Sequence, residues 1–266
     1  MPHKYAINAR LLGDENVLPW TNLGDWSKSS PQQPLSYPQA CENLARRLAD
    51  RLNLNSNDRL LDLGCGQGAS LRLWLEQYQL KQLEPVELQA ECIQRIKQHL
   101  PIVQAVNQLN FLNLKNFEFK KFDVVLCIDA AYHVNLNSFL SSITSVLNSK
   151  ARVGFHTLMW SDQTLNSNFW QQQQYRYLLK AADVKAKNLN SQAHIVQIMQ
   201  QAGFEQIEIE DLSEVVFAGF AEYIEQRCQQ NKMHVDGLKI AMTAKLCRKL
   251  YTDGLVRYVQ ITAQHK

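Results

Sequence analysis

The sequence contains no apolar run that approaches the ~20 residues needed for a membrane-spanning helix. Its first residues, Met-Pro-His-Lys-Tyr, lack the apolar core of a secretion signal. The six cysteines are scattered without a Cys-x-x-Cys pair, which is typical of reduced thiols in a cytosolic protein, and we assign no metal site. The net charge is only +3, and no block of lysine or arginine indicates a nucleic-acid or membrane partner. We therefore expect a cytoplasmic protein, monomeric or homodimeric, without either partner.

The most informative segment present is 60–68, Leu-Leu-Asp-Leu-Gly-Cys-Gly-Gln-Gly. A short apolar stretch, long enough for a buried strand, stops at three glycines, and apolar residues then follow at helical spacing. In this arrangement the backbone approaches a nucleotide-like ligand closely, and helix N–H groups point at it. Gly64, Gly66 and Gly68 form G-x-G-x-G, whereas dinucleotide sites prefer G-x-G-x-x-G. A tight turn in an ordinary α/β unit is the alternative interpretation.

This run resembles motif I of the class I S-adenosylmethionine-dependent methyltransferases, in particular those that act on small molecules. The resemblance implies S-adenosylmethionine as the cofactor, which presents a carboxylate, an ammonium and a sulfonium rather than a pyrophosphate. Bare backbone at the first two glycines suits so slim a ligand, and a helix N-terminus near the third favours its carboxylate. The cofactor-binding residues that we assign to this run are Asp62, Gly64, Cys65, Gly66 and Gly68.

Residues after the second and third predicted strands extend the cofactor site. Glu87 follows the glycine loop by about twenty residues, where nucleotide-binding sheets place an acid that accepts hydrogen bonds from ribose hydroxyls. Stabilising the N-terminus of the next helix is the alternative role for Glu87. Leu88 lies in the same stretch, which resembles the family's second motif. Many members have an acid after the third strand that contacts adenine; this chain has none there, so Asn110, or alternatively Asn107, is our candidate for that contact.

The segment after the fourth predicted strand, Ile-Asp-Ala-Ala-Tyr-His, resembles the region that lines the sulfonium and the substrate in small-molecule methyltransferases. The resemblance places Ile128 and Asp129 beside the cofactor and points Tyr132 and His133 toward the acceptor. His156 lies at the end of the fifth predicted strand, so both histidines would project into one cavity. Because histidine titrates near neutral pH, both are candidate general bases, and a polar lining role is the alternative.

Strand and helix patterns alternate along most of the chain. Strands are predicted at 59–63, 83–87, 102–106, 122–128 and 151–158, with two later extended runs at 204–209 and 255–263. The alternation predicts an α/β fold, a Rossmann-like doubly wound sheet. The resemblance implies seven strands, mostly parallel, with an antiparallel last strand and helical cover segments.

We expect a single domain over residues 1–266. Residues 40–160 form its cofactor-binding core, and 201–211 and 255–266 form its closing strands. The remaining residues form three cover segments, 1–39, 161–200 and 212–254. The first cover is rich in aromatic residues despite its prolines, so we expect a packed arm rather than a disordered tail. From the covers we assign Trp26, Tyr37 and Trp170 to acceptor binding, with a core role as the alternative for each.

These features favour an S-adenosylmethionine-dependent methyltransferase that transfers a methyl group to a small-molecule acceptor by in-line displacement, with a histidine as the base where a proton must be removed. A non-catalytic S-adenosylmethionine-binding module that acts through a partner is one alternative, and a nicotinamide dehydrogenase is another. A nucleic-acid or protein methyltransferase is a third. The sequence lacks the Asn/Asp-Pro-Pro-Tyr/Phe motif and the Pro-Cys nucleophile that such enzymes use.

Overall fold

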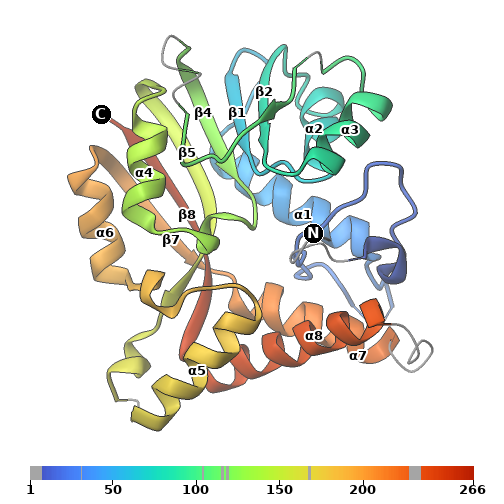
Figure 1. Cartoon of the computed structure of the whole chain (residues 1–266), viewed down its shortest axis with the longest axis vertical. Coiled ribbons are helices and arrows are strands. Elements are labelled where there is room, and N and C mark those ends of the chain that lie inside the picture. The colour runs from blue at the N-terminus through green and yellow to red at the C-terminus, as the bar shows by residue number, and fades with distance from the viewer. Residues whose placement is uncertain are drawn as a thin grey trace.

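One twisted sheet organises the chain in the computed structural model (Figure 1). The structure describes residues 8–30, 32–103, 105–114, 117, 120–166, 169–227 and 235–266, and the side chains of 165–172 and 181 lie outside this description. In spatial order the main strands are β3 (Asn107–Gln108), β2 (Gln82–Glu87), β1 (Arg59–Leu63), β4 (Phe122–Cys127), β5 (Leu147–Trp160), β8 (Val256–His265) and β7 (Phe204–Asp211). A two-residue strand, β6 (Asn190–Ser191), pairs with β5.

Strand directions confirm the predicted sheet. β1 pairs in parallel with β2 and β4, and β5 continues the parallel set beside β4. β8 is antiparallel to both of its neighbours, β5 and β7. The fold is therefore the Rossmann-like α/β sheet with an antiparallel last strand. The predicted third strand is present but its position, 102–106, is wrong: β3 pairs with β2 at Asn107–Gln108, while Val103 and Val106 pack as buried coil residues.

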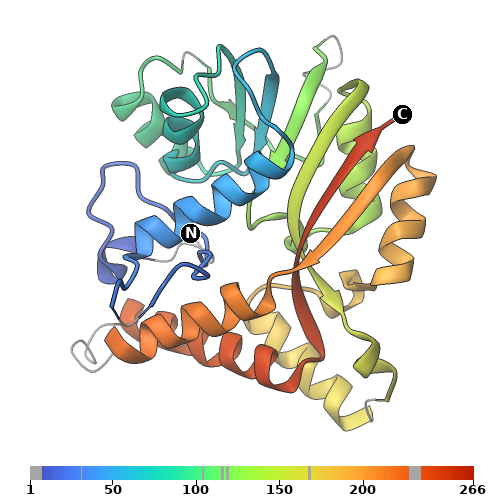
Figure 2. The same ribbon diagram turned by 180° about the vertical axis from the view of Figure 1, so that it is seen from behind.

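Helices cover both faces of the sheet because the central strands are apolar on both sides. Leu60 and Val124 pack on the face that carries α1 (Tyr37–Arg51), α2 (Ala69–Glu76) and α3 (Ala90–His99). Leu61 and Val125 face the opposite side, which carries α4 (Leu136–Thr144) and α6 (Gln192–Gln201). Figure 2 shows the first group of helices from behind. α1 begins at a capping box in which Ser36 and Gln39 satisfy each other's backbone N–H groups.

A third group of helices lies at the carboxyl end of the parallel strands (Figures 1 and 2). It comprises α5 (Phe169–Ala181), α7 (Gly219–Arg227) and α8 (Val235–Asp253). Short helical turns complete the description: η1 (Ala9–Leu12), η3 (Ala131–His133), η4 (Asp162–Asn166), η5 (Ala186–Asn188) and the π-helical η6 (Glu214–Ala218). Within the described ranges, no helix combines the length and apolar character that crossing a bilayer requires.

One predicted cover segment divides differently from the prediction. In 161–200, only the first part, with α5, belongs to the helical group at the strand ends. β6 extends the sheet beside β5, and the buried residues Ile195, Ile198 and Met199 of α6 pack in the same core cluster as α4. The apolar residues of α6 are thus part of the core, and the assignment of the whole segment 161–200 to a cover was wrong.

Candidate functional site

The turn between β1 and α2 has the geometry that its three glycines predict. Gly64, Gly66 and Gly68 have φ angles of +73°, +54° and +91°, in the region that side-chain-bearing residues rarely adopt. A Cβ atom on Gly68 would lie 2.7 Å from Cγ1 of buried Ile96, so this glycine permits close packing of the loop against α3. A Cβ atom on Gly66 would instead lie 3.3 Å from Oγ1 of Thr21. Gly66 therefore faces Thr21 of the N-terminal arm.

Glu87 ties the end of β2 to this turn. One carboxylate oxygen accepts a hydrogen bond from the Gly66 amide at 2.9 Å. The other accepts from the amides of Leu88 and Gln89, each at 2.9 Å. The bonds to Leu88 and Gln89 correspond to the helix-stabilising role that is the alternative for Glu87. The bond to Gly66 brings the carboxylate beside the glycine loop, where the predicted cofactor site lies. Leu88 follows with 61% of its surface exposed.

Asp62, the fourth residue of β1, holds the first turns of α2 in place. Its buried carboxylate accepts hydrogen bonds from the Ser70 hydroxyl at 2.8 Å and the Trp74 indole at 2.7 Å. Burial raises the pKa of Asp62 to about 6, and these two donors oppose the increase. Asp62 therefore acts on the cofactor loop mainly by fixing the helix that follows it.

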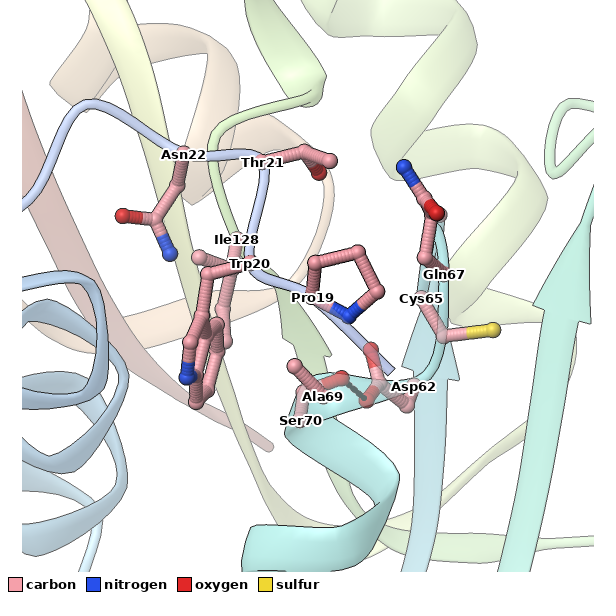
Figure 3. Close-up of a pocket in the computed structure, with 11 residues that line it drawn as sticks. Pro19, Trp20, Thr21, Asn22, Asp62, Cys65, Gln67, Ala69, Ser70 and Ile128 are labelled. Carbon is pink, nitrogen blue, oxygen red and sulfur yellow. Dashed lines mark hydrogen bonds between the residues drawn. The ribbon is translucent and has the colours of Figure 1, made fainter. Parts of the chain in front are cut away.

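A narrow cavity lies between the glycine loop and the N-terminal arm (Figure 3). Its volume is about 30 Å³. The structure brings four predicted cofactor residues to it, namely Asp62, Gly64, Cys65 and Ile128. The remaining lining residues are Pro19, Trp20, Thr21, Asn22, Gln67, Ala69 and Ser70. The arm residues among these were not identified from the sequence; the aromatic-rich arm predicted a cover without indicating which of its residues face the loop.

Buried contacts hold the arm in this position. Buried Asp14 accepts a hydrogen bond from the Trp20 amide at 2.8 Å. The Tyr37 hydroxyl donates to the carbonyl of Asn22 at 2.8 Å. The Trp26 ring stacks on Tyr223 of α7 with 4.4 Å between centroids. Because Tyr37 is fully buried and Trp26 only 7% exposed, the structure favours the core role that was the alternative for both.

The segment after β4 places Asp129 and Tyr132 between the arm and β8. Asp129 accepts hydrogen bonds from the Leu23 amide at 3.2 Å and the Tyr258 hydroxyl at 2.9 Å, and Tyr132 also bonds to its carboxylate. Burial raises the pKa of Asp129 to about 7, and the three donors oppose the increase. Tyr258 was not predicted as a site residue, since nothing local in β8 marks it.

The two predicted bases occupy different environments. His133 is half-buried in η3, with Nδ1 at 3.3 Å from the Asp183 carbonyl and its ring 4.4 Å from that of Tyr132. Burial lowers the pKa of His133, so the ring is neutral at neutral pH. His156 is fully buried in β5, with Nε2 3.4 Å from the Gln260 amide oxygen, and burial lowers its pKa to about 4. This burial gives a catalytic role for His156 no geometric support.

The other predicted residues lie at the periphery of this site. Asn110 is exposed after the short strand β3, and its side chain accepts a hydrogen bond from the Leu112 amide. Asn107 bonds instead to Glu84 and to the Pro85 carbonyl, so Asn110 is the better candidate for adenine. Trp170 lies in α5, and its side chain is outside the described part. Among the described residues, no cluster of three or more potential ligands could hold a metal ion.

Comparison with known proteins agrees with this geometry. A family model described as a methyltransferase domain matches residues 36–209. The chain belongs to this methyltransferase family. The match runs from the start of α1 into β7 and so includes the glycine loop, Glu87 and the segment after β4. The predicted family membership and enzyme class are confirmed.

The individual relatives share little sequence with this chain. Methyltransferase phqN of Penicillium fellutanum is 24% identical over 194 residues, and the match spans 71% of this chain but only 58% of that protein. A geranyl diphosphate C-methyltransferase from Streptomyces coelicolor A3(2), crystallised with Mg²⁺, geranyl-S-thiolodiphosphate and S-adenosyl-L-homocysteine, superposes with a TM-score of 0.73 at 20% identity. That match covers 98% of this chain and 92% of the other. The cyclopropane synthase MmaA2 from Mycobacterium tuberculosis gives a TM-score of 0.72 at 15% identity over 99% and 98% of the two chains. These likenesses show a shared fold.

Proposed function

We propose that this methyltransferase uses S-adenosylmethionine and methylates a small molecule. The observation that carries the proposal is the glycine loop at the carboxyl end of β1, whose Gly66 amide is fixed by Glu87 and whose bare surface faces a narrow cavity. The residues fit the cofactor: a side chain on Gly66 would fill the space that faces the arm, and a helix N-terminus follows the loop. The solved methyltransferases of this fold that carry S-adenosyl compounds support the same cofactor.

The cofactor residues have separate roles in this proposal. Gly64, Cys65 and Gly66 present backbone to the amino-acid end, and Glu87 accepts hydrogen bonds from the ribose. Leu88 and Asn110 contact the adenine, and Ile128 lines the wall opposite the loop. The bound cofactor supplies a methyl group that is already activated by its sulfonium. What the protein adds is mainly position, since an aligned in-line displacement needs little further chemistry.

His133 removes a proton from the acceptor where one must leave. A carbonyl oxygen can only accept, so the contact with Asp183 requires the hydrogen to be on Nδ1, and the lone pair is then on Nε2. The lowered pKa keeps the ring neutral and able to accept a proton at neutral pH. Tyr132, whose ring lies against His133, is the residue that we assign to the acceptor side.

A small-molecule acceptor is favoured by the helices at the strand ends. α5, α7 and α8 gather where the acceptor must enter, which suits an enclosed substrate that is shielded from water. One of the solved structures named above is a geranyl diphosphate C-methyltransferase, an enzyme whose name states a small-molecule substrate. The low net charge gives no electrostatic reason to expect nucleic acid.

The decisive experiment combines binding with turnover. The protein is titrated with S-adenosylhomocysteine and with NAD by calorimetry, and is then incubated with S-adenosylmethionine and a cell extract. The extract is divided by an ultrafilter into small molecules and retained macromolecules. We expect S-adenosylhomocysteine to be formed when only the small-molecule filtrate is added. Release only with the retained fraction would instead indicate a protein or nucleic-acid acceptor, and binding without release in either fraction would indicate a non-catalytic module. Failure to bind S-adenosylhomocysteine would refute the cofactor assignment.

A further inference from the structure

Among the described hydrogen bonds of residues 22–26, one joins the N-terminal arm to the segment that follows β4, and its acceptor is the Asp129 carboxylate. The Leu23 amide donates to Asp129 Oδ2 at 3.2 Å across 106 positions of sequence. The residues that precede these two in the chain, Asn22 and Ile128, both line the cavity beside the glycine loop. The Leu23–Asp129 hydrogen bond therefore lies at the rim of the cofactor cavity, where the arm meets the end of β4.

The other described backbone contacts of this stretch lead elsewhere. The Asn22 carbonyl accepts from Tyr37 and Cys41 of α1. The Asp25 amide donates to the Ala40 carbonyl at 2.8 Å, and the Trp26 amide donates to Val215 in η6. These contacts fix the base of the arm on helices. Asp129 is the residue that joins the arm to the strand end beside the cofactor.

Asp129 is itself held by two tyrosines from separate elements. Tyr258 of β8 donates to Oδ1 at 2.9 Å, and Tyr132 of η3 bonds to the same carboxylate. The backbone of Asp129 has φ +53°, a left-handed conformation that a non-glycine residue keeps only where its surroundings enforce it. Hydrogen bonds from the arm, from η3 and from β8 provide that enforcement.

We propose that Asp129 is a positioning residue that clamps the N-terminal arm over the bound cofactor, and that Tyr258 and Tyr132 orient its carboxylate for this task. The inference rests on the proposed use of S-adenosylmethionine. Hydrogen bonds to an ionised carboxylate are roughly twice as strong as those between neutral groups. At a pH above the Asp129 pKa of about 7, where the binding measurements below are made, this contact therefore contributes more to arm closure than an ordinary backbone bond. The clamp acts on how tightly the cofactor is held, because Asp129 contacts the arm rather than the reacting atoms.

The test uses Asp129→Asn and Tyr258→Phe. Asparagine tolerates left-handed backbone well, so D129N keeps the turn while removing the charge. Tyr78→Phe is the matched control, since the Tyr78 hydroxyl also donates to an aspartate, Asp50, but at the surface on α1. We expect the dissociation constant for S-adenosylhomocysteine, measured by calorimetry, to rise about tenfold in D129N and several-fold in Y258F. Y78F should match the wild type, and kcat at saturating cofactor should change less than the cofactor KM.

Hydrogen exchange without ligand separates this proposal from the proposed function. In D129N and Y258F the Leu23 amide should exchange about tenfold faster than in the wild type, while the Asp25 amide, bonded to Ala40, stays protected. If the wild type binds no S-adenosylhomocysteine, the cofactor assignment fails and the exchange rates still test the clamp. Unchanged exchange at Leu23 together with unchanged affinity overturns the clamp. A collapse of kcat with unaltered cofactor affinity also overturns it, since Asp129 would then act in the chemical step.

Discussion

Gly66→Ala should weaken cofactor binding strongly while leaving the protein folded. Gly66 has φ +54°, inside the small left-handed region that an alanine can occupy at about 1 kcal/mol. The new methyl group would lie 3.3 Å from Thr21 Oγ1, a few tenths of an ångström too close. The loss of folding stability should therefore stay near 1–2 kcal/mol, because the Thr21 side chain can move aside in the free protein.

The binding loss follows from the same contact. When the cofactor is bound between the loop and the arm, neither the loop nor the Thr21 side chain can move away from the new methyl group without losing contacts to the cofactor. Overpacking of this kind typically costs about 1–3 kcal/mol, and each 1.4 kcal/mol is a tenfold change in affinity. We therefore expect the dissociation constant for S-adenosylhomocysteine to rise about 10- to 100-fold.

Titration calorimetry and thermal denaturation of G66A measure the two quantities separately. Gly203→Ala is the matched control, because Gly203 also has positive φ, +87°, but its nearest neighbour is His265 at 3.6 Å, between α6 and β7. G203A should lose at least as much stability, since φ +87° lies outside the left-handed region that alanine occupies most easily, and should keep wild-type affinity. A folded G66A that binds S-adenosylhomocysteine within threefold of the wild type would show that the ligand does not lie on this loop, and the site would have to be sought elsewhere.

Three further predictions address single residues. His133→Ala should lower turnover by about 10²-fold or more with an acceptor that must lose a proton, with cofactor affinity within a few-fold; unchanged turnover with such an acceptor would remove His133 as the base. Glu87→Gln should weaken S-adenosylhomocysteine about tenfold by calorimetry, since the amide replaces one acceptor oxygen with a donor beside the Gly66 or Leu88 amide; equal affinity would exclude the ribose contact. Asp62→Asn should change the pH dependence of stability. The folded protein holds the Asp62 proton up to about pH 6 and the unfolded chain releases it near 4, so burial of this acid makes the free energy of unfolding fall as pH rises between these values. The stability of D62N relative to the wild type, from denaturant unfolding, should therefore increase from pH 4 to pH 7 by at most about 3 kcal/mol, and a constant difference would contradict the raised pKa.

Local pattern was sufficient for the features that depend on neighbouring residues. The glycine turn, the buried strand before it and the acid at the end of β2 are set by backbone conformation and burial over a few positions, and the structure contains all three. The third strand was placed a few residues too early because only two residues pair with β2, which is too short for any periodicity. The helix α6 was misassigned to a cover because its apolar residues pack in the core at a position that only the strand order defines.

Tertiary pairing decides the rest of the site. Tyr37 and Trp26 are aromatic residues in a predicted cover, but whether such a ring lines a cavity or anchors the cover depends on which side meets α1 and α7. Tyr258 joins Asp129 from 129 positions away. His156 lies near the expected strand end, yet β5 continues to Trp160 and β8 pairs along this part of it, so the side chain is covered.

The segment from Ile128 to His133 combines three features that the fold cannot separate. Ile128 lines the cavity beside the glycine loop, Asp129 bonds to the arm, and His133 lies beside Tyr132. Because six consecutive positions carry all three, a shift of the Asp129 backbone should displace the wall of the proposed cofactor site and the proposed base together. Substitutions in this segment should therefore be non-additive with changes in the arm, as expected for residues that share partners. The left-handed turn at Asp129 is the structural reason, since it sets the direction in which the chain leaves β4.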